Sequence, residues 1–131
     1  MVDRKHRSVC AFCELTAEAT YELRLGSMAA IRDAYPVTEG HYLIVPMRHE
    51  EDFFSLSETE LLDARKVALE LKRRVVASDS RVVGFNIGVN QGAAAGQTIA
   101  HVHIHLIPRR QGDTPLPRGG VRGVIPGRMG Y

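Results

Sequence analysis

Alternating apolar and polar side chains predict strands in the first third of the chain. Between residues 19 and 34, apolar positions alternate with polar ones on both sides of a turn at Gly26-Ser27. Alternate side chains of a strand face the same side, so this pattern indicates a β-hairpin. The apolar run 41–46, which follows Pro36 and Gly40, predicts a third strand.

Helical spacing of apolar residues predicts one long amphipathic helix over residues 58–77. Ser57 and Glu60 form a capping box at its start, in which each side chain bonds the backbone amide of the other residue. Asp79 and Ser80 end the helix. The residues expected on its buried face are Leu61, Ala64, Ala68, Leu71 and Val75.

Two further strands follow the helix. Residues 82–90 form an apolar segment with interspersed glycines, and residues 100–107 form a last strand that Pro108 stops. Strands, one long helix and then more strands indicate an α+β fold with a mostly antiparallel sheet.

The composition is that of an ordinary globular protein with one domain. The chain has 131 residues, of which 44% are hydrophobic and 24% charged, and this length allows a substantial core. No apolar stretch is long enough to cross a membrane. Residues 1–7 are basic but lead into no apolar segment, so we expect no secretory signal and a cytoplasmic protein. A net charge of +2 gives no indication of a nucleic-acid partner.

The C-terminal segment 108–131 differs from the rest of the chain. It carries five Arg and one Asp, six of the 12 Gly and four of the six Pro. We therefore separate a domain over residues 1–110 from a basic, glycine- and proline-rich tail over residues 111–131. Composition leaves two interpretations open: a solvated tail, or an arm that binds an anion or a partner subunit.

Three histidines at alternate positions are the strongest chemical signal in the sequence. His101, His103 and His105 would share one face of a strand, while the apolar residues between them face the core. Two chemistries fit such a row. In one, the imidazoles hold a catalytic zinc ion with an open coordination position. In the other, the central histidine acts as a nucleophile or general base.

A loop rich in small residues precedes this row. The backbone amides of residues 92–98 and the hydroxyl of Thr98 could cradle phosphate oxygens. A phosphate cradle beside three imidazoles favours a phosphoryl substrate. Attack of an imidazole on phosphorus would give a phosphoramidate intermediate, which water then opens.

The histidine row and its flanks match a known signature. Residues 101–107 fit the histidine triad pattern, His-x-His-x-His followed by two apolar residues, and the match extends into residues 96–99 and 108–109. The chain therefore resembles the histidine triad (HIT) superfamily over most of residues 10–110. This resemblance implies an α+β fold with a five-stranded antiparallel sheet, one long and one short helix. It also implies a homodimer in which two sheets join into one.

The resemblance further implies a reaction, the hydrolysis or transfer of a nucleoside monophosphate group. His103 would attack the α-phosphorus to form a nucleotidyl-histidine, His105 would contact the phosphate or the leaving group, and His101 completes the catalytic triad. The implied substrate-binding residues are Asn90, Gln97 and Thr98 near the phosphate, His41 beside them, Asp33 at the ribose hydroxyls, and Ile31, Leu43 and Phe12 around the base.

A CxxC motif at Cys10 and Cys13 indicates metal or redox chemistry, because structural disulfides are rare in a reducing cytoplasm. No thioredoxin-like pattern surrounds it, which favours a metal. Some proteins of the superfamily that the chain resembles hold zinc with such a pair and two histidines, which here would be His49 and His101. We therefore expect a structural zinc ion bound by Cys10, Cys13, His49 and His101, and no organic cofactor.

Features of two branches of the superfamily occur together. Residues 95–98 and the Ile-Pro-Arg after the triad resemble the dinucleoside polyphosphate hydrolases, whereas Asn90 resembles the phosphoramidases. We predict a hydrolase that releases a nucleoside monophosphate, AMP, from dinucleoside polyphosphates or related nucleotides through His103. The alternatives are an AMP-amine phosphoramidase and a nucleotide-binding signalling protein with little catalysis.

Overall fold

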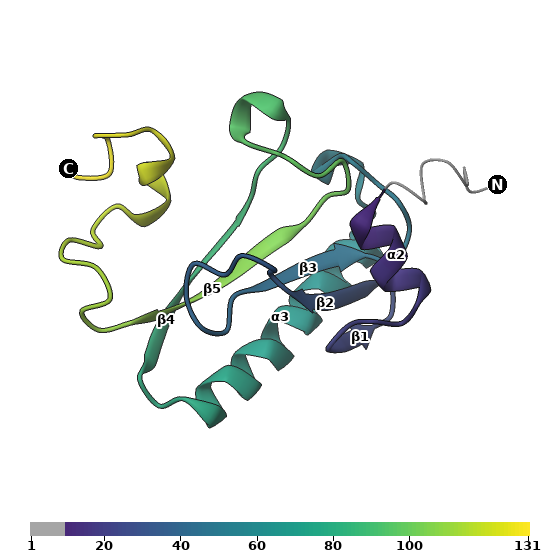
Figure 1. Ribbon diagram of the computed structural model, residues 1–131, viewed down its shortest axis with the longest axis horizontal. Helices are drawn as coiled ribbons and strands as arrows, with labels where there is room; N and C mark the ends of the chain where they lie inside the picture. Colours follow the sequence, from purple (N-terminus) through teal and green to yellow (C-terminus); the bar gives the residue numbers. More distant parts are fainter. Residues whose placement is uncertain (1–9) are drawn as a thin grey trace.

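A five-stranded antiparallel sheet organises the computed structural model, which describes residues 10–131 (Figure 1). The strands are β1 (Leu23–Leu25), β2 (Met28–Arg32), β3 (Tyr42–Pro46), β4 (Val82–Val89) and β5 (Ile104–Arg110). They lie in the order β1-β2-β3-β5-β4, and every neighbouring pair is antiparallel. The predicted α+β fold and its five-stranded sheet are confirmed. The homodimer stays a prediction, and the expectation about residues 1–7 lies outside the described residues.

A helix packs on each face of the sheet. The long helix α3 (Glu58–Ser78) contacts β1, β2, β3 and β4, and the short helix α2 (Ala11–Ala17) packs on the other face against β2 and β3. Side chains of β2 alternate between the two layers, so that Met28 and Ala30 face α3 while Ala29 and Ile31 face α2. Three short 3-10 helices lie in the loops: Phe53–Ser55, Ala93–Ala95 and Gly120–Val124.

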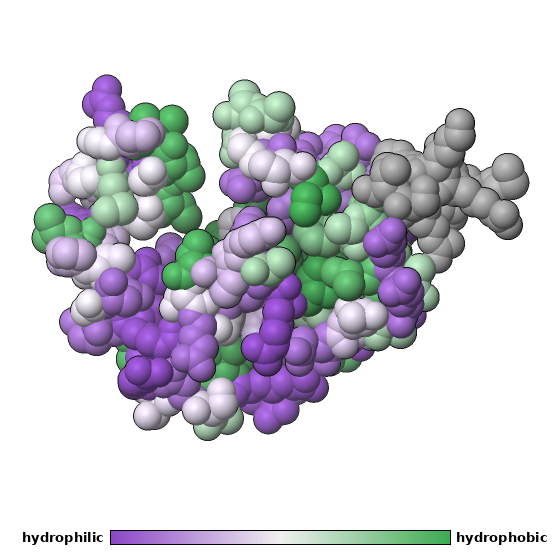
Figure 2. Space-filling model, in the orientation of Figure 1, coloured by the Kyte–Doolittle hydropathy of each residue, from purple (hydrophilic) through white to green (hydrophobic). Residues whose placement is uncertain are grey.

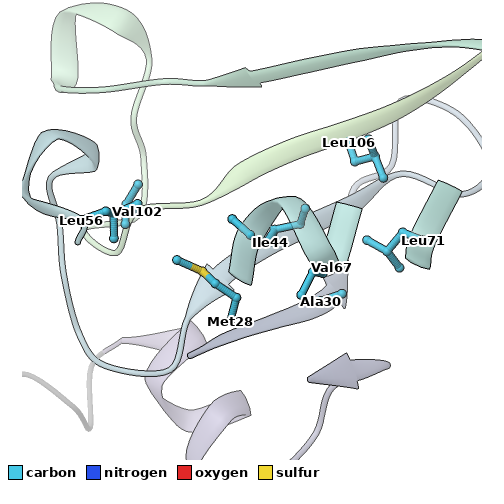
Figure 3. Packing of buried hydrophobic residues seen from close by; sticks show 9 residues of the cluster. Met28, Ala30, Ile44, Leu56, Val67, Leu71, Val102 and Leu106 are labelled. Carbon is cyan, nitrogen blue, oxygen red and sulfur yellow. The ribbon is translucent and has the colours of Figure 1, made fainter. Parts of the chain in front are cut away.

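The larger core lies between α3 and the sheet (Figure 3). Its buried side chains are Met28, Ala30, Ile44, Leu56, Ala64, Val67, Leu71, Val102 and Leu106. No helix that the structure describes is long and apolar enough to span a membrane.

The start of α3 confirms the predicted capping box. Ala64, Leu71 and Val75 are buried as expected, but Glu60 and Val67 are buried in place of Leu61 and Ala68. The Ser57 hydroxyl accepts from the Glu60 amide at 3.1 Å, and the Glu60 carboxylate accepts from the Ser57 amide at 2.9 Å. Glu60 is buried, whereas Leu61, expected inside, is 42% exposed. Arg48 explains this difference, because its guanidinium donates to both oxygens of Glu60 at 2.9 Å and so compensates the buried charge.

The last strand begins later than the sequence indicates. β5 starts at Ile104, so His101 and His103 precede it and His105 lies on it. The amide of Val102 donates to the carbonyl of Glu50, 2.6 Å away, instead of joining the ladder. The expectation that all three histidines form a row on one strand is therefore wrong.

The same strand also continues past Pro108, where an end was expected. β3 pairs with β5 only as far as Leu106. Beyond that point β5 continues beside β4, and Pro108 lies opposite Phe85. The missing amide hydrogen of the proline thus costs no bond to β3, and the strand runs on to Arg110.

Residues 111–131 form an arm that leaves β5 and contacts β4 through the 3-10 helix Gly120–Val124 (Figure 1). Arg109 anchors its start through two bonds of 2.8 Å to the carboxylate of Asp113. Gly119 is required where the arm turns back, because its φ is +93° and a Cβ there would collide with the carbonyl of Met129. Specific contacts therefore organise the arm. The division into a domain over 1–110 and a tail stays a prediction.

Candidate functional site

His103 is held in one orientation and one tautomer. Its Nδ1 atom lies 2.9 Å from the carbonyl oxygen of His101, and a carbonyl only accepts, so Nδ1 carries the hydrogen. Neutral His103 then has its lone pair on Nε2. The ring is buried, and the Phe12 ring meets it nearly edge-on with the ring centres 5.2 Å apart. An imidazole whose lone pair is directed by a backbone bond is suited to nucleophilic attack.

A chain of hydrogen bonds sets the protons of His41 and His105. The amide of Val37 donates to His41 Nδ1 at 3.1 Å, so neutral His41 carries its hydrogen on Nε2. That nitrogen lies 2.9 Å from His105 Nδ1, which therefore accepts. His105 carries its own hydrogen on Nε2, and this buried atom has no hydrogen-bond partner within residues 10–131. The site thus offers a buried N–H donor to a group outside the chain.

The electrostatic surroundings of these two rings keep them neutral. Burial lowers the pKa of His41, and the Asp33 carboxylate, which raises it, offsets part of this effect. Burial also lowers the pKa of His105; charges on His103 and His41 would lower it further, and Asp33 raises it. Neutral rings at neutral pH are what the hydrogen-bond chain requires.

Asp33 faces the imidazoles in this structure. Its Oδ2 lies 3.3 Å from His41 Nε2 and 3.9 Å from His105 Nδ1, and its Oδ1 accepts from the Tyr35 amide at 2.8 Å. The spacing of these three side chains would suit a metal ion, but the hydrogen on His41 Nε2 blocks the nitrogen that would bind it. The cluster is therefore a hydrogen-bond network. The ribose contact expected of Asp33 stays a prediction.

The apolar residues expected around a base come together beside His103. Phe12, Ile31 and Leu43 belong to one buried cluster between α2 and the sheet, and each is at most 5% exposed. The Phe12 ring contacts both His101 and His103, which places this cluster next to the triad. The three side chains pack on one another as core, so a base would meet them at the edge of the cluster. Their role in binding stays a prediction.

The loop before the triad uses many of its polar groups internally. Four amides donate to acceptors inside the loop: those of Gly92, Ala95, Gly96 and Gln97. The expected backbone cradle for phosphate is therefore wrong for these positions. The Gln97 side chain is also engaged, since its amide nitrogen donates to the carbonyls of Glu51 and Ile99. Asn90 is half-buried and Thr98 exposed, and their phosphate contacts stay predictions.

The four expected metal ligands lie together on the α2 side of the triad. Cys13 Sγ lies 3.1 Å from His49 Nδ1 and 3.5 Å from His101 Nδ1, and Cys10 Sγ lies 3.4 Å from His101 Nδ1. All four ligand atoms lie within 4.8 Å of one another. His101 Nε2 donates to the Pro46 carbonyl at 3.0 Å, which leaves Nδ1 for a metal. Two thiols and two imidazoles in this arrangement fit a closed tetrahedral zinc site.

Arg110 is a site residue that the sequence analysis missed. Its Nε and Nη2 lie 3.1 Å and 3.0 Å from Asp79 Oδ2, while Nη1 donates to Thr38 Oγ1 at 2.8 Å and Nη2 to the Glu39 carbonyl at 3.0 Å. Thr38 and Glu39 follow Val37, whose amide sets the tautomer of His41. Nothing in the basic C-terminal segment distinguishes this arginine from its exposed neighbours, so no sequence signal identifies it.

Known structures and sequences resemble this chain. A zinc-bound histidine triad family protein from Mycobacterium smegmatis superimposes with a TM-score of 0.74 and 30% identity, over 82% of this chain and 80% of that one. An uncharacterized HIT-like protein of Mycoplasma genitalium is 34% identical over 115 residues, which are 82% of this chain and 78% of that protein.

Two other relatives have named activities. The AP-4-A phosphorylase of Mycobacterium tuberculosis is 39% identical over 88 residues, 64% of this chain and 43% of that enzyme. The asymmetrical bis(5'-nucleosyl)-tetraphosphatase of Schizosaccharomyces pombe is 38% identical over 89 residues, 65% of this chain and 46% of that enzyme. The match thus spans less than half of either enzyme. The model of the HIT domain family matches residues 14–112, which contain all three histidines of the triad. The chain belongs to the HIT domain family.

Proposed function

We propose that this protein hydrolyses dinucleoside polyphosphates or related nucleotides and releases AMP through a nucleotidyl intermediate on His103. One observation carries this proposal: the ring of His103, whose Nε2 is unprotonated in the neutral form, lies 5.2 Å centre to centre from the ring of His105, which carries a buried N–H. The site therefore pairs an electron-pair donor with a hydrogen-bond donor. A phosphoryl group between them would have its nucleophile on one side and support for an oxygen on the other.

The first step forms a bond between His103 Nε2 and the α-phosphorus, while the bond from phosphorus to the leaving oxygen breaks. The positive charge that develops on His103 is stabilised by the His101 carbonyl at Nδ1. His105 Nε2–H donates a hydrogen bond to the leaving oxygen. In the second step water attacks phosphorus, the N–P electron pair returns to His103, and the released proton passes to solvent. Asn90 and Thr98 would bind the remaining phosphate oxygens.

The neutral state of His105 favours a phosphoanhydride over a phosphoramidate. A polyphosphate leaves as a stable anion, so a hydrogen bond to its oxygen is sufficient help. An amine leaves only after it has received a proton, and a neutral imidazole N–H is a very weak acid. Because burial lowers the pKa of His105, an acidic imidazolium form is scarce at neutral pH. The relatives that act on dinucleoside tetraphosphates by name agree with this choice.

A zinc ion at the cluster of two cysteines and two histidines would stabilise this site from its α2 side. Cys10, Cys13, His49 and His101 would hold zinc, which supplies a structural cross-link between α2 and the triad when bound. His101 then has two tasks, since its ring belongs to the metal site and its carbonyl orients His103.

The test is nucleotide turnover by the wild-type protein and His103→Ala. The panel contains diadenosine polyphosphates, an AMP-amine phosphoramidate and a UDP-sugar, with products separated by chromatography. We expect AMP from the diadenosine polyphosphates, and a loss of at least about 10³-fold in kcat for the variant. Binding of AMP by both proteins without any turnover would refute catalysis and leave a nucleotide-binding protein. Faster turnover of the phosphoramidate would refute the argument from neutral His105.

A further inference from the structure

A cavity of about 640 Å³ lies between the C-terminal arm and strands β4 and β5 of the sheet. Its walls include Ile107 of β5, Asn86 of β4, and Val121, Val124 and Met129 of the arm. Figure 2 shows the arm as a lobe that stands apart from the body of the molecule, with a hollow between them. The proposed reaction makes no use of this cavity or of the arm.

The cavity lies farther along β5 than His105, which is on the proposed leaving-group side of the site. His105 and Ile107 point to the same face of β5, about 7 Å apart along the strand. Val37 also lines the cavity, and its amide is the one that bonds His41. The walls of the cavity thus include the residue two positions beyond His105 on β5 and the residue whose amide bonds His41, although neither histidine is itself part of the walls.

Hydrogen bonds hold the arm in position beside this cavity. Arg109 donates to Asn86 at 2.6 Å as well as to Asp113, so the first turn of the arm is fixed to both β4 and β5. A Cβ at Gly120 would lie 3.1 Å from the Asn86 side chain, which shows how closely the arm approaches the sheet there. The arm nevertheless exposes Val121 and Val124, at 59% and 76%. Apolar side chains held in place at the wall of a cavity are available for a ligand.

We propose that this cavity binds the second nucleoside of a dinucleoside polyphosphate, the one that departs with the polyphosphate. The inference rests on the proposed function and names its substrate class more closely. Ile107, Val121 and Val124 would contact the faces of the base, while Asn86 and Thr38 would meet polar edges of the base or sugar. A few polar groups in an apolar wall are typical of a small-molecule pocket of this size. The enzyme therefore prefers substrates with a nucleoside at both ends.

Two substrates that share the scissile bond test this proposal. Diadenosine tetraphosphate and adenosine 5'-tetraphosphate both yield AMP by attack at the α-phosphorus, but the second has no nucleoside on its leaving group. The measured quantity is the ratio of their kcat/KM values. We expect the wild-type ratio to exceed about ten, since even small apolar contacts can discriminate at this level.

The matched variants lie on the same arm. Val121→Gln/Val124→Gln changes two exposed side chains of the cavity, and Leu116→Gln/Ile125→Gln changes two that are not part of its walls but are equally exposed, at 76% and 59%. We expect the first pair to bring the ratio close to one and the second pair to leave it unchanged. A wild-type ratio of one, or equal effects of the two pairs, would overturn the cavity proposal while turnover itself supports the proposed function. No turnover of either substrate would overturn both.

Discussion

Removing the Arg110 guanidinium tests whether one partly buried arginine holds the loop that carries His41, one of the proposed site histidines. The side chain is 13% exposed and joins β5 to Thr38, to the Glu39 carbonyl and to Asp79. Arg110→Met keeps most of the aliphatic stem but removes every donor. The loop that begins at Asp33 and ends at His41 would then lose its attachment to β5.

The expected loss follows from the bonds to the loop. A hydrogen bond to a charged group contributes about 1.5–3 kcal/mol net. The bond to Thr38 is only partly buried and the bond to the Glu39 carbonyl is exposed, so the two together contribute about 2–3 kcal/mol. For a chain of this size, each kcal/mol lost from the free energy of unfolding lowers the melting temperature by about 3–5 °C. Arg110→Met should therefore lower Tm by about 10 °C. In Arg110→Met the Val37 amide should also hold His41 less firmly. We therefore expect kcat to be reduced even at a temperature at which the variant is fully folded.

Arg81→Met is the matched control, because Arg81 binds the same Asp79 carboxylate but its side chain is 69% exposed. An exposed pair contributes little, so this variant should melt close to the wild type. Urea unfolding and thermal melts measure both variants, and kcat is measured at a temperature where each is folded. Equal destabilisation by the two substitutions, or wild-type stability of Arg110→Met, would refute the assignment of the loop attachment to Arg110.

Three further predictions address the histidines, the metal site and the start of α3. NMR titration should place the midpoints of His41 and His105 below about 6.5, the value of an unperturbed histidine, because burial lowers both pKa values. As the pH falls, the two histidines take up protons in the unfolded chain before they do so in the folded protein. Their contribution to stability is therefore present above a pH of about 6.5 and declines below it. A titration midpoint at or above about 6.5 would contradict the buried hydrogen-bond chain. Cys13→Ser should reduce bound zinc, measured by native mass spectrometry, while Glu14→Ser on the same helix retains it; full occupancy in Cys13→Ser would remove this thiol from the ligand set. Glu60→Ala should lower the free energy of unfolding in urea by about 2–3 kcal/mol, because it removes the acceptor for the Ser57 amide and the partner of Arg48. Glu60→Gln should lower it less, since glutamine retains a hydrogen-bond acceptor. Similar losses for the two variants would show that this acceptor contributes nothing to stability.

Local patterns predicted those parts of the fold that local physics determines. The helix at 58–77 was within one residue of its observed end because capping and apolar spacing both act over a few residues. The exchange of Glu60 for Leu61 on its buried face depends on Arg48, which approaches from another segment. No periodicity within the helix contains that information.

The same distinction applies to the site. Residue types and the triad pattern identified four candidate metal ligands, whose ligand atoms the structure brings within 4.8 Å of one another. The start of β5 depends on a bond between Val102 and Glu50, segments far apart in sequence. The phosphate cradle failed at four amides because a sequence shows how many donors a loop has, but not that they satisfy one another.

The hydrogen bond that His103 Nδ1 donates to the His101 carbonyl makes the three histidines of the signature unequal. A peptide carbonyl is present at every residue type, so position 101 can orient the proposed nucleophile without an imidazole. In the proposed zinc site, the ring would supply coordination, and a thiolate could supply that equally well. His101→Cys would therefore exchange one candidate metal ligand for another and keep the carbonyl that accepts from His103. At position 103, by contrast, no other side chain could replace both ring nitrogens. In the proposed site, the main chain of His101 orients His103, its ring belongs to the metal cluster, and only the ring of His103 takes part in the reaction.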